Sequence, residues 1–221
     1  MNAPGAFFFP ERGALLPLPY SVVALLGVVA GVAIAVSDAG RRVEWYVYDE
    51  YTRQAASRYE PAPNVVVVAI DEPSFAEVGL QWPWPRSMHA ALVDQLKRGG
   101  ARTIAFDIVF DTESSDPDDD REFAEAIGRA GNVILAANRA FVADRQYAIE
   151  QWIEPLPMFA ERAAAVAGVG IPYDEDSVLR RAVLLDDGRP SLALAVASRA
   201  AGFTTPLGVD MSAPQLFRFH C

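Results

Sequence analysis

Asn64–Phe110 begins with the run Val65-Val66-Val67-Val68-Ala69-Ile70 and ends with the run Thr103-Ile104-Ala105-Phe106-Asp107-Ile108-Val109-Phe110. Apolar runs of this length, rich in β-branched residues and bounded by turn formers, are typical of strands that are buried on both faces. The residues between the two runs favour helix. The stretch therefore predicts a βαβ unit, in which the two strands are parallel.

The alternation of strand and helix continues along the chain. Helices are expected at 73–78, 87–98, 121–129, 158–165 and 191–201, and Gly79 and Gly99-Gly100 are placed to end the first two. Further strands are expected at 133–137, and at 166–171 and 179–185 as a hairpin-like pair. Residues 215–219 are expected to be the start of a strand that the chain does not finish. This order predicts an α/β fold, with a three-layer core and a mostly parallel sheet.

The N-terminal part of the chain is strongly apolar. No charged residue occurs from Ala14 to Val36, and roughly 20 apolar residues in a helix span the hydrocarbon core of a bilayer. The sequence predicts one transmembrane helix over 18–37. Two alternatives remain open at this point, a buried core helix and a signal peptide cleaved within Ala33–Ala39.

The span divides the rest of the chain into four parts. Residues 1–17 are expected to be an N-terminus before the membrane, 38–63 a membrane-proximal stalk and linker, 64–205 the main domain, and 206–221 a truncated tail. A cytoplasmic side for 1–17 and an extracytoplasmic side for 64–205 are implied only by the family resemblance given below. The flanking charges favour the opposite orientation, because Arg41 and Arg42 follow the span whereas only Arg12 precedes it. The two indications about orientation conflict.

Composition excludes several classes of partner and cofactor. The chain has 221 residues, 52% of them hydrophobic, and a net charge of -10, so a nucleic-acid partner is not expected. Its single cysteine, Cys221, permits neither an internal disulfide nor a cysteine metal site. His89 and His220 do not form a zinc motif, and no Gly-rich phosphate loop follows the first strand. No cofactor, metal or catalytic residue is predicted.

Five residues are candidates for binding a ligand. Asp71 and Asp107 end the two apolar strands, and ligands bind at the carboxyl edge of parallel sheets. Alternatively, Asp71 caps the following helix and Asp107 pairs with an arginine. Trp82, Trp84 and Arg86 lie in a stiff Trp-Pro-Trp-Pro-Arg tract, where two indoles beside a guanidinium form either a ligand-binding wall or a cover for the core.

The order of these motifs resembles a known family, the second type of CHASE domain. The resemblance rests on Val68-Ala69-Ile70-Asp71-Glu72-Pro73-Ser74, on Trp82-Pro83-Trp84-Pro85-Arg86, and on Gly99-Gly100-Ala101-Arg102-Thr103-Ile104-Ala105-Phe106-Asp107-Ile108-Val109-Phe110. It extends to the preceding Trp45, Tyr48, Asp49 and Arg53, and to the later Asp118-Asp119-Asp120 and Gly131-Asn132-Val133-Ile134-Leu135. The similarity covers roughly 43–201.

The resemblance implies an extracytoplasmic sensory domain of a bacterial transmembrane receptor. In such receptors further membrane spans follow the domain, and then a cytoplasmic adenylate or guanylate cyclase, histidine kinase or Ser/Thr kinase. This chain stops at Cys221, before any such region. We therefore expect the N-terminal part of a receptor, without enzymatic activity of its own, that is attached to the cell membrane and binds an unknown small-molecule ligand on the periplasmic or extracellular side.

Other functions and assemblies stay open from the sequence alone. One is a cation-dependent hydrolase that uses the carboxylates at the strand ends, and another is a structural module for dimerisation or anchoring. A homodimer is compatible with either the sensory or the structural function.

Overall fold

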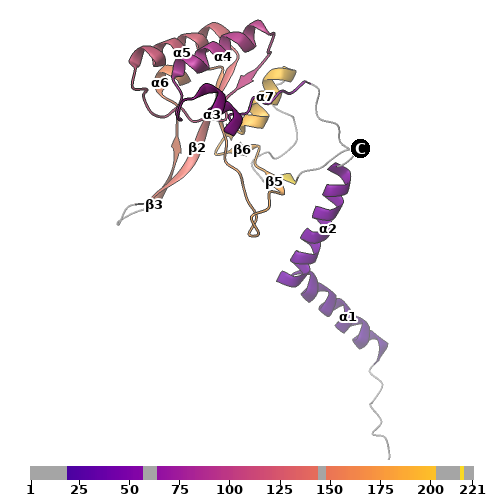
Figure 1. Cartoon of the computed structure of the whole chain (residues 1–221). Coiled ribbons are helices and arrows are strands. Elements are labelled where there is room, and N and C mark those ends of the chain that lie inside the picture. The colour runs from indigo at the N-terminus through magenta and orange to yellow at the C-terminus, as the bar shows by residue number, and fades with distance from the viewer. Residues whose placement is uncertain (1–18, 57–63, 144–147, 203–214, 217–221) are drawn as a thin grey trace, which may run out of the picture. The chain divides into compact units, whose positions relative to one another are not determined.

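The computed structural model describes residues 19–56, 64–143, 148–202 and 215–216 (Figure 1). The chain divides into two compact units, one that contains the two N-terminal helices and one that contains the remaining elements.

The N-terminal unit consists of α1 (Tyr20–Ala35) and α2 (Asp38–Ala56), which meet at a bend of 67°. The Ser37 hydroxyl donates a hydrogen bond of 2.7 Å to the Ile34 carbonyl at this bend. Gly40 is required there, because a Cβ at this position would overlap the Ile34 carbonyl oxygen.

The predicted single transmembrane helix over 18–37 is not shown. The 16 residues of α1 rise by about 24 Å, which is less than the roughly 30 Å of hydrocarbon in a bilayer. Among the described residues no single helix is long and apolar enough to cross a membrane. By length and composition, α1 and α2 meet that criterion only as a bent pair.

A four-stranded sheet forms the centre of the second unit. Its strands are β1 (Ile104–Ala105), β2 (Val133–Ala143), β3 (Ala148–Ile153) and β4 (Ala165–Gly168). β2 pairs in parallel with β1 and β4, and its C-terminal half pairs antiparallel with β3. The predicted α/β fold with a parallel sheet is confirmed.

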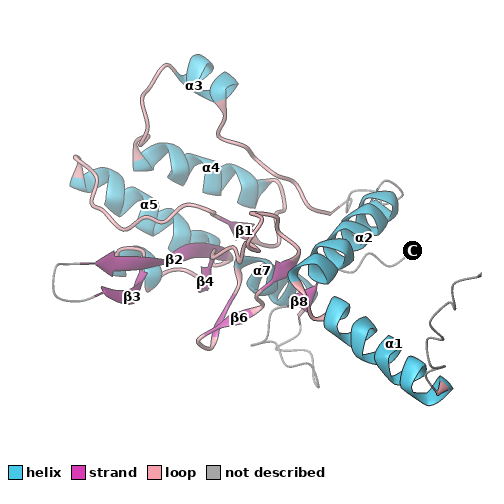
Figure 2. Cartoon of the chain, turned by 90° about the horizontal axis from the view of Figure 1, so that it is seen from below, coloured by secondary structure: helices cyan, strands magenta, loops and turns pink. Residues whose placement is uncertain are grey.

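Helices cover both faces of this sheet. On one face lie α4 (Arg86–Arg98), α5 (Pro117–Ala130) and α6 (Pro157–Ala160), and α4 and α5 run side by side (Figures 1 and 2). On the other face lies α7 (Leu192–Ala201). Side chains of β2 alternate between the two layers, since Val133 and Leu135 pack toward α4–α6 whereas Ile134 packs toward α7.

Smaller elements complete the second unit. The helix α3 (Glu72–Val78) precedes α4, and two short antiparallel pairs join β5 (Arg181–Ala182) to β8 (Gln215–Leu216) and β6 (Leu185–Asp186) to β7 (Arg189–Pro190). The β6–β7 hairpin turns at Asp187 and Gly188, whose φ angles are 51° and 77°. An Asp-Gly pair suits a two-residue hairpin turn because both positions need positive φ.

The predicted first strand is wrong for this structure. Residues 65–70 belong to no helix or sheet, and their side chains are largely exposed. The apolar, β-branched run that predicted a strand records only a local preference, whereas hydrogen bonding to a neighbouring strand depends on tertiary docking.

Four other features differ from expectation: one strand pairing and the bounds of three elements. The segments 166–171 and 179–185 do not form a hairpin, because β4 pairs with β2 and β5 pairs with β8. The strand expected over 103–110 is reduced to Ile104–Ala105, and the helix expected at 158–165 to Pro157–Ala160. α5 begins at Pro117 and not at 121, because Asp116 caps it.

Candidate functional site

A cavity of about 430 Å³ lies where the parallel strands end. Its walls come from β2, β3, the residues after β4, and the β6–β7 hairpin with its flanks: Asn138, Arg139, Glu150, Trp152, Gly168, Gly170, Ile171, Pro172, Val183, Asp186, Arg189 and Ser191. The parallel pairing of β2 with β4 ends at Ala137 and Gly168, so the cavity opens at their carboxyl edge. This edge of an α/β sheet is the usual place for a ligand, and the volume suits a small molecule.

Trp152 on β3 forms the aromatic wall of the cavity. The Cζ atoms of Arg189 and Arg139 lie 4.3 Å and 5.6 Å from its ring centroid. Gly168 makes room for the indole, because a Cβ there would lie 3.1 Å from Trp152 Cη2. Both guanidiniums thus gain a cation–π contact with one ring.

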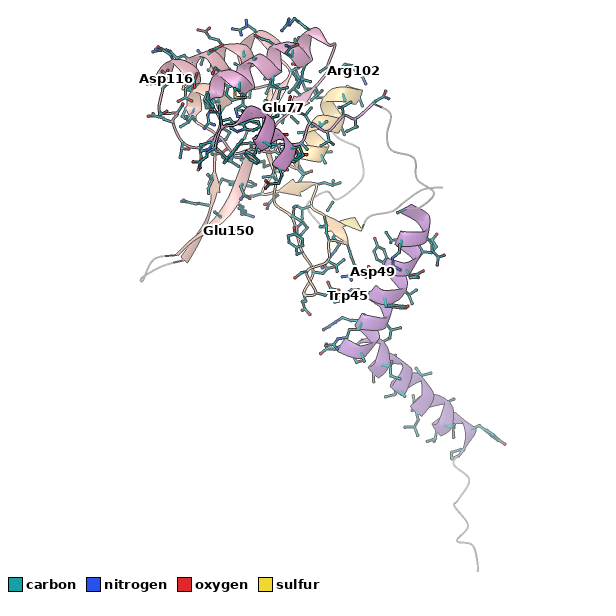
Figure 3. The ribbon with its side chains drawn as sticks, viewed as in Figure 1. Trp45, Asp49, Glu77, Arg102, Asp116 and Glu150 are labelled. Carbon is teal, nitrogen blue, oxygen red and sulfur yellow. The ribbon has the colours of Figure 1, made fainter. Side chains whose placement is uncertain are left out.

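Carboxylates balance the two arginines. Arg139 Nη1 donates to Asp186 Oδ1 over 2.7 Å, and Arg189 Nη1 donates to Glu154 Oε2 over 2.7 Å. Because Arg139 and Glu154 come from the sheet side, these bonds tie the β6–β7 hairpin to the sheet. Glu150, on the hairpin formed by β2 and β3 (Figure 3), lies 3.7 Å from Arg139 Nε.

The Nε atom of Arg139 is buried and has no hydrogen bond in the described part of the chain. The 3.7 Å to Glu150 exceeds hydrogen-bonding distance, although it still permits an ion pair. A buried donor without an acceptor costs free energy, roughly 1–3 kcal/mol. Arg139 also lines the cavity, so a small movement of its side chain would let the guanidinium donate to an acceptor bound there.

The predicted carboxylates do not line this cavity. Asp71 is exposed and caps α3, where it accepts from the backbone N–H of Ser74 at 3.1 Å. Hydrogen bonds from Ser74 hold the pKa of Asp71 below its usual value. Asp107 is exposed just after β1, and in the described residues no hydrogen bond or ion pair joins it to Asp71.

The tryptophan tract packs against the aromatic core. Trp84 is buried, its Nε1 donates to the Leu80 carbonyl at 3.2 Å, and its ring lies 6.0 Å from that of Trp82 and 5.5 Å from that of Phe75. Trp82 remains 43% exposed. The structure thus brings the two indoles together at the end of α3, away from the cavity.

Arg86 is held inside the same core. Its Nη2 donates to the Thr112 carbonyl at 3.2 Å, its Nε lies 3.6 Å from Asp120 Oδ1, and its Cζ lies 4.7 Å from the Phe110 ring centroid. Burial lowers the pKa of Arg86, an effect that the charge of Asp120 opposes. These contacts hold the guanidinium within the core of the domain.

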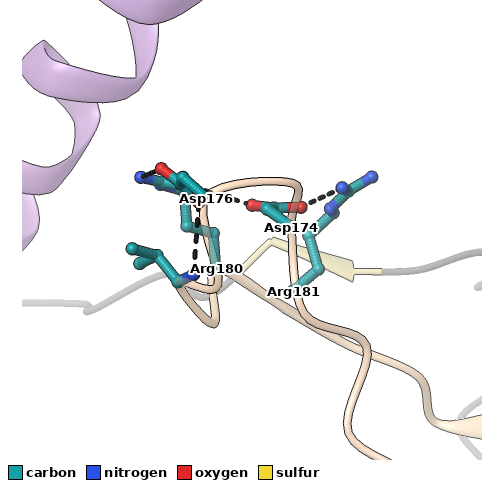
Figure 4. Close-up of polar contacts among 5 residues, drawn as sticks. Asp174, Asp176, Arg180 and Arg181 are labelled. Carbon is teal, nitrogen blue, oxygen red and sulfur yellow. Dashed lines mark hydrogen bonds and ion pairs between the residues drawn. The ribbon is translucent and has the colours of Figure 1, made fainter.

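A second charged cluster lies in the loop that continues from the cavity wall (Figure 4). Asp174 Oδ2 accepts from Arg180 Nη1 at 3.1 Å and its other oxygen accepts from Arg181, while Asp176 Oδ2 accepts from Arg180 Nη2 at 2.7 Å. The hydrogen bond from Arg181 is the main cause that lowers the pKa of Asp174. The cluster closes the loop on itself and so fixes the chain that follows Pro172.

The sequence alone did not single out the residues of the cavity. The Asp187-Gly188 pair was the one local signal, because it predicts the hairpin that carries Asp186 and Arg189. Arg139 and Asp186 are 47 positions apart, so no local motif joins them. In the described ranges, no group of three or more His, Cys, Asp or Glu residues is arranged to hold a metal ion.

Comparison with known proteins gives one match. The family model of the CHASE2 domain matches residues 23–218, which is nearly the whole chain. No curated protein and no solved structure matches the chain significantly. The family comprises sensory extracellular domains of receptors. Because the match covers nearly all of its residues, this chain belongs to the CHASE2 domain family.

Proposed function

We propose that this chain is the signal-input part of a membrane receptor, and that the cavity beside Trp152 binds a small acidic solute outside the cytoplasm. The single observation that carries the ligand class is the buried Nε of Arg139, which has no hydrogen bond in the described residues. Two guanidiniums and one indole favour a ligand that has an acidic group and a compact body.

Binding would change how the β6–β7 hairpin is held. A ligand carboxylate that accepts from Arg139 competes with Asp186 for the same guanidinium. Occupancy would therefore weaken one of the ties between hairpin and sheet. A ligand shifts an equilibrium only if its affinity differs between the two states, and this competition supplies such a difference.

In a full-length receptor this change would regulate a cytoplasmic cyclase or kinase. Support for that output comes from membership of a sensory receptor family. Sequencing of the coding DNA beyond codon 221 tests it. Further spans and a cyclase or kinase domain would support the proposal, and an unrelated following sequence would contradict direct regulation.

The ligand proposal is tested by thermal unfolding of the full chain in detergent with a panel of amino acids, dicarboxylates, hydroxy acids and neutral sugars. We expect acidic members of the panel to raise Tm, and neutral sugars to leave it unchanged. The variant R139Q should weaken binding about tenfold or more, because hydrogen bonds to charged groups contribute roughly 1.5–3 kcal/mol.

R199Q is the matched control. Arg199 lies on α7, outside the cavity, and donates to the Gly131 carbonyl at 2.6 Å. It should keep the full ligand response. The proposal fails if no acidic compound raises Tm, or if R139Q and R199Q respond alike.

A further inference from the structure

A continuous apolar segment of the second unit is exposed and packs against no other element in the described part of the chain. Val65, Val66, Val67, Val68 and Ile70 are 67%, 83%, 84%, 55% and 37% exposed. Contiguous apolar surface of this kind in a soluble domain marks a place for another element. The composition is that of a strand with both faces covered, so the expected partner is a sheet edge between two helical layers.

The sheet has such an edge at β1. Ile104 N donates to Asn132 O at 3.1 Å and Phe106 N donates to Ile134 O at 3.0 Å, so these residues face β2. Successive residues of a strand direct their backbone groups to opposite sides, and Thr103, Ala105 and Asp107 therefore face outward. β1 ends the strand order, and in the described residues no backbone hydrogen bond reaches this outer side. An edge of this type is a template for a further strand.

The chain between the segment and β1 contains the helix α4, which a parallel crossover connection requires. β1 leads through α5 to its parallel neighbour β2, with α5 packed on the same face of the sheet as α4. The segment 65–70 leads through α4 to β1. If it lay parallel to β1 on the outer side, its crossover would have the same hand as the β1–α5–β2 crossover, as parallel connections within one sheet do.

The sequence also fixes a register for this pairing. Val68-Ala69-Ile70-Asp71 and Ile104-Ala105-Phe106-Asp107 share one order: large apolar, alanine, large apolar, aspartate. Aligning the aspartates places Ala69 beside Ala105. Val68 and Ile70 then face the layer of α4 and α5, as Ile104 and Phe106 do.

We propose that the outer edge of β1 is the acceptor for Val65–Ile70 of the same chain, which adds to the sheet as a parallel strand in this register. The exposed segment and the docked strand are two states of the domain. The segment belongs to the first described stretch of the chain after α2. When it docks, the first strand of the sheet therefore follows α2 directly in the chain order. The inference does not depend on the ligand proposed for the cavity.

Disulfide trapping tests the docked state in the full chain in detergent. Cys221 is the only native cysteine, so a C221S background carries no competing thiol. In that background A69C/A105C places two cysteines side by side on the same face of neighbouring strands. The two strands lie about 4.8 Å apart. V68C/A105C is the matched control, because adjacent residues project to opposite faces and the Cβ atoms are then too far apart for a disulfide.

With copper phenanthroline as oxidant, A69C/A105C should form an intrachain disulfide at least fivefold faster than V68C/A105C, measured by peptide mass spectrometry. Equal rates in the two pairs, or no disulfide, would overturn the proposal. A covalent dimer joined through the same two cysteines would also overturn it, because the occupant would then be a second copy of the chain.

Hydrogen exchange on the unmodified chain provides a second measurement that needs no variant. In the proposed register the amides of Val68 and Ile70 donate to β1. Peptides covering 64–71 should therefore retain at least two amides that exchange tenfold or more slowly than in an unstructured peptide. Full exchange at the unstructured rate would rule out a docked strand.

Discussion

At the scale of single residues, His89 is the buried group with the clearest consequence for stability. Its side chain is 3% exposed, its ring lies 5.4–6.0 Å from those of Phe106, Phe110 and Phe123, and its Nε2 has no hydrogen bond within the described ranges. Burial first, and then the positive charge of Arg86, lowers the pKa of His89 from 6.5 to about 4. The imidazole is therefore neutral in the folded domain at neutral pH.

This shift predicts a stability that depends on pH. Between about pH 4 and 6.5 the unfolded chain binds a proton at His89 that the folded chain does not. The stability that this group contributes is therefore complete above pH 6.5 and is lost as the pH falls toward 4. The loss is about 3 kcal/mol. In H89F the free energy of unfolding, measured by urea titration at several pH values, should lose this part of its pH dependence.

H220F is the control, since His220 is the other histidine of the chain. It should leave the pH dependence between 4 and 6.5 as it is in the parent. An unchanged slope in H89F would show that His89 is not buried in its neutral form.

At the scale of elements, three helices begin and end with recognisable caps. Asp71, Asp116 and Ser191 accept from backbone N–H groups of the first turn at 3.1, 2.9 and 3.2 Å. Each helix ends at a glycine with positive φ: Gly79, Gly131 and Gly202, at 68°, 64° and 71°. These caps satisfy backbone groups that the helix itself leaves without partners.

Removal of the cap of α5 should destabilise the whole second unit. α5 supplies Phe123 and Ile127 to the core, so fraying at its start affects packing against the sheet. We expect D116A to reduce the free energy of unfolding by about 1 kcal/mol, measured by urea denaturation. D118A removes a charge from the same turn without removing the cap acceptor, and should cost only a few tenths of a kcal/mol. Equal losses in both variants would assign the effect to charge and not to the cap.

At the scale of the whole molecule, the proposed receptor topology has the second unit on the outer side of a membrane. The family is extracytoplasmic, whereas Arg41 and Arg42 after the apolar segment favour the opposite orientation. Long domains can be translocated regardless of nearby charge, so the flanking arginines do not contradict the proposed outer location.

A reporter fused after residue 221 measures this orientation. Alkaline phosphatase folds actively only outside the cytoplasm, so its fusion should be active, and a green fluorescent protein fusion at the same position should be dark. The reverse pattern would place the sensory domain in the cytoplasm and contradict the proposed receptor topology.

The sequence by itself determined the α/β class, the family, the positions of α3, α4 and α7, and the end of α3 at Gly79. These features depend on residues three or four positions apart, as in the bond from Asp71 to Ser74, or on motif strings such as Trp82–Arg86. Such interactions form within one element and leave a local pattern. They do not reveal which strands become neighbours.

Only the tertiary structure decided the sheet pairing and the cavity. The Val65–Ile70 run has the composition of a strand, yet its exposure shows that pairing also requires a neighbour. The cavity joins Arg139 to Asp186 across 47 positions and Arg189 to Glu154 across 35. Contacts over such separations arise when the sheet orders β2, β3 and β4 in space, and no local pattern along the chain records that order.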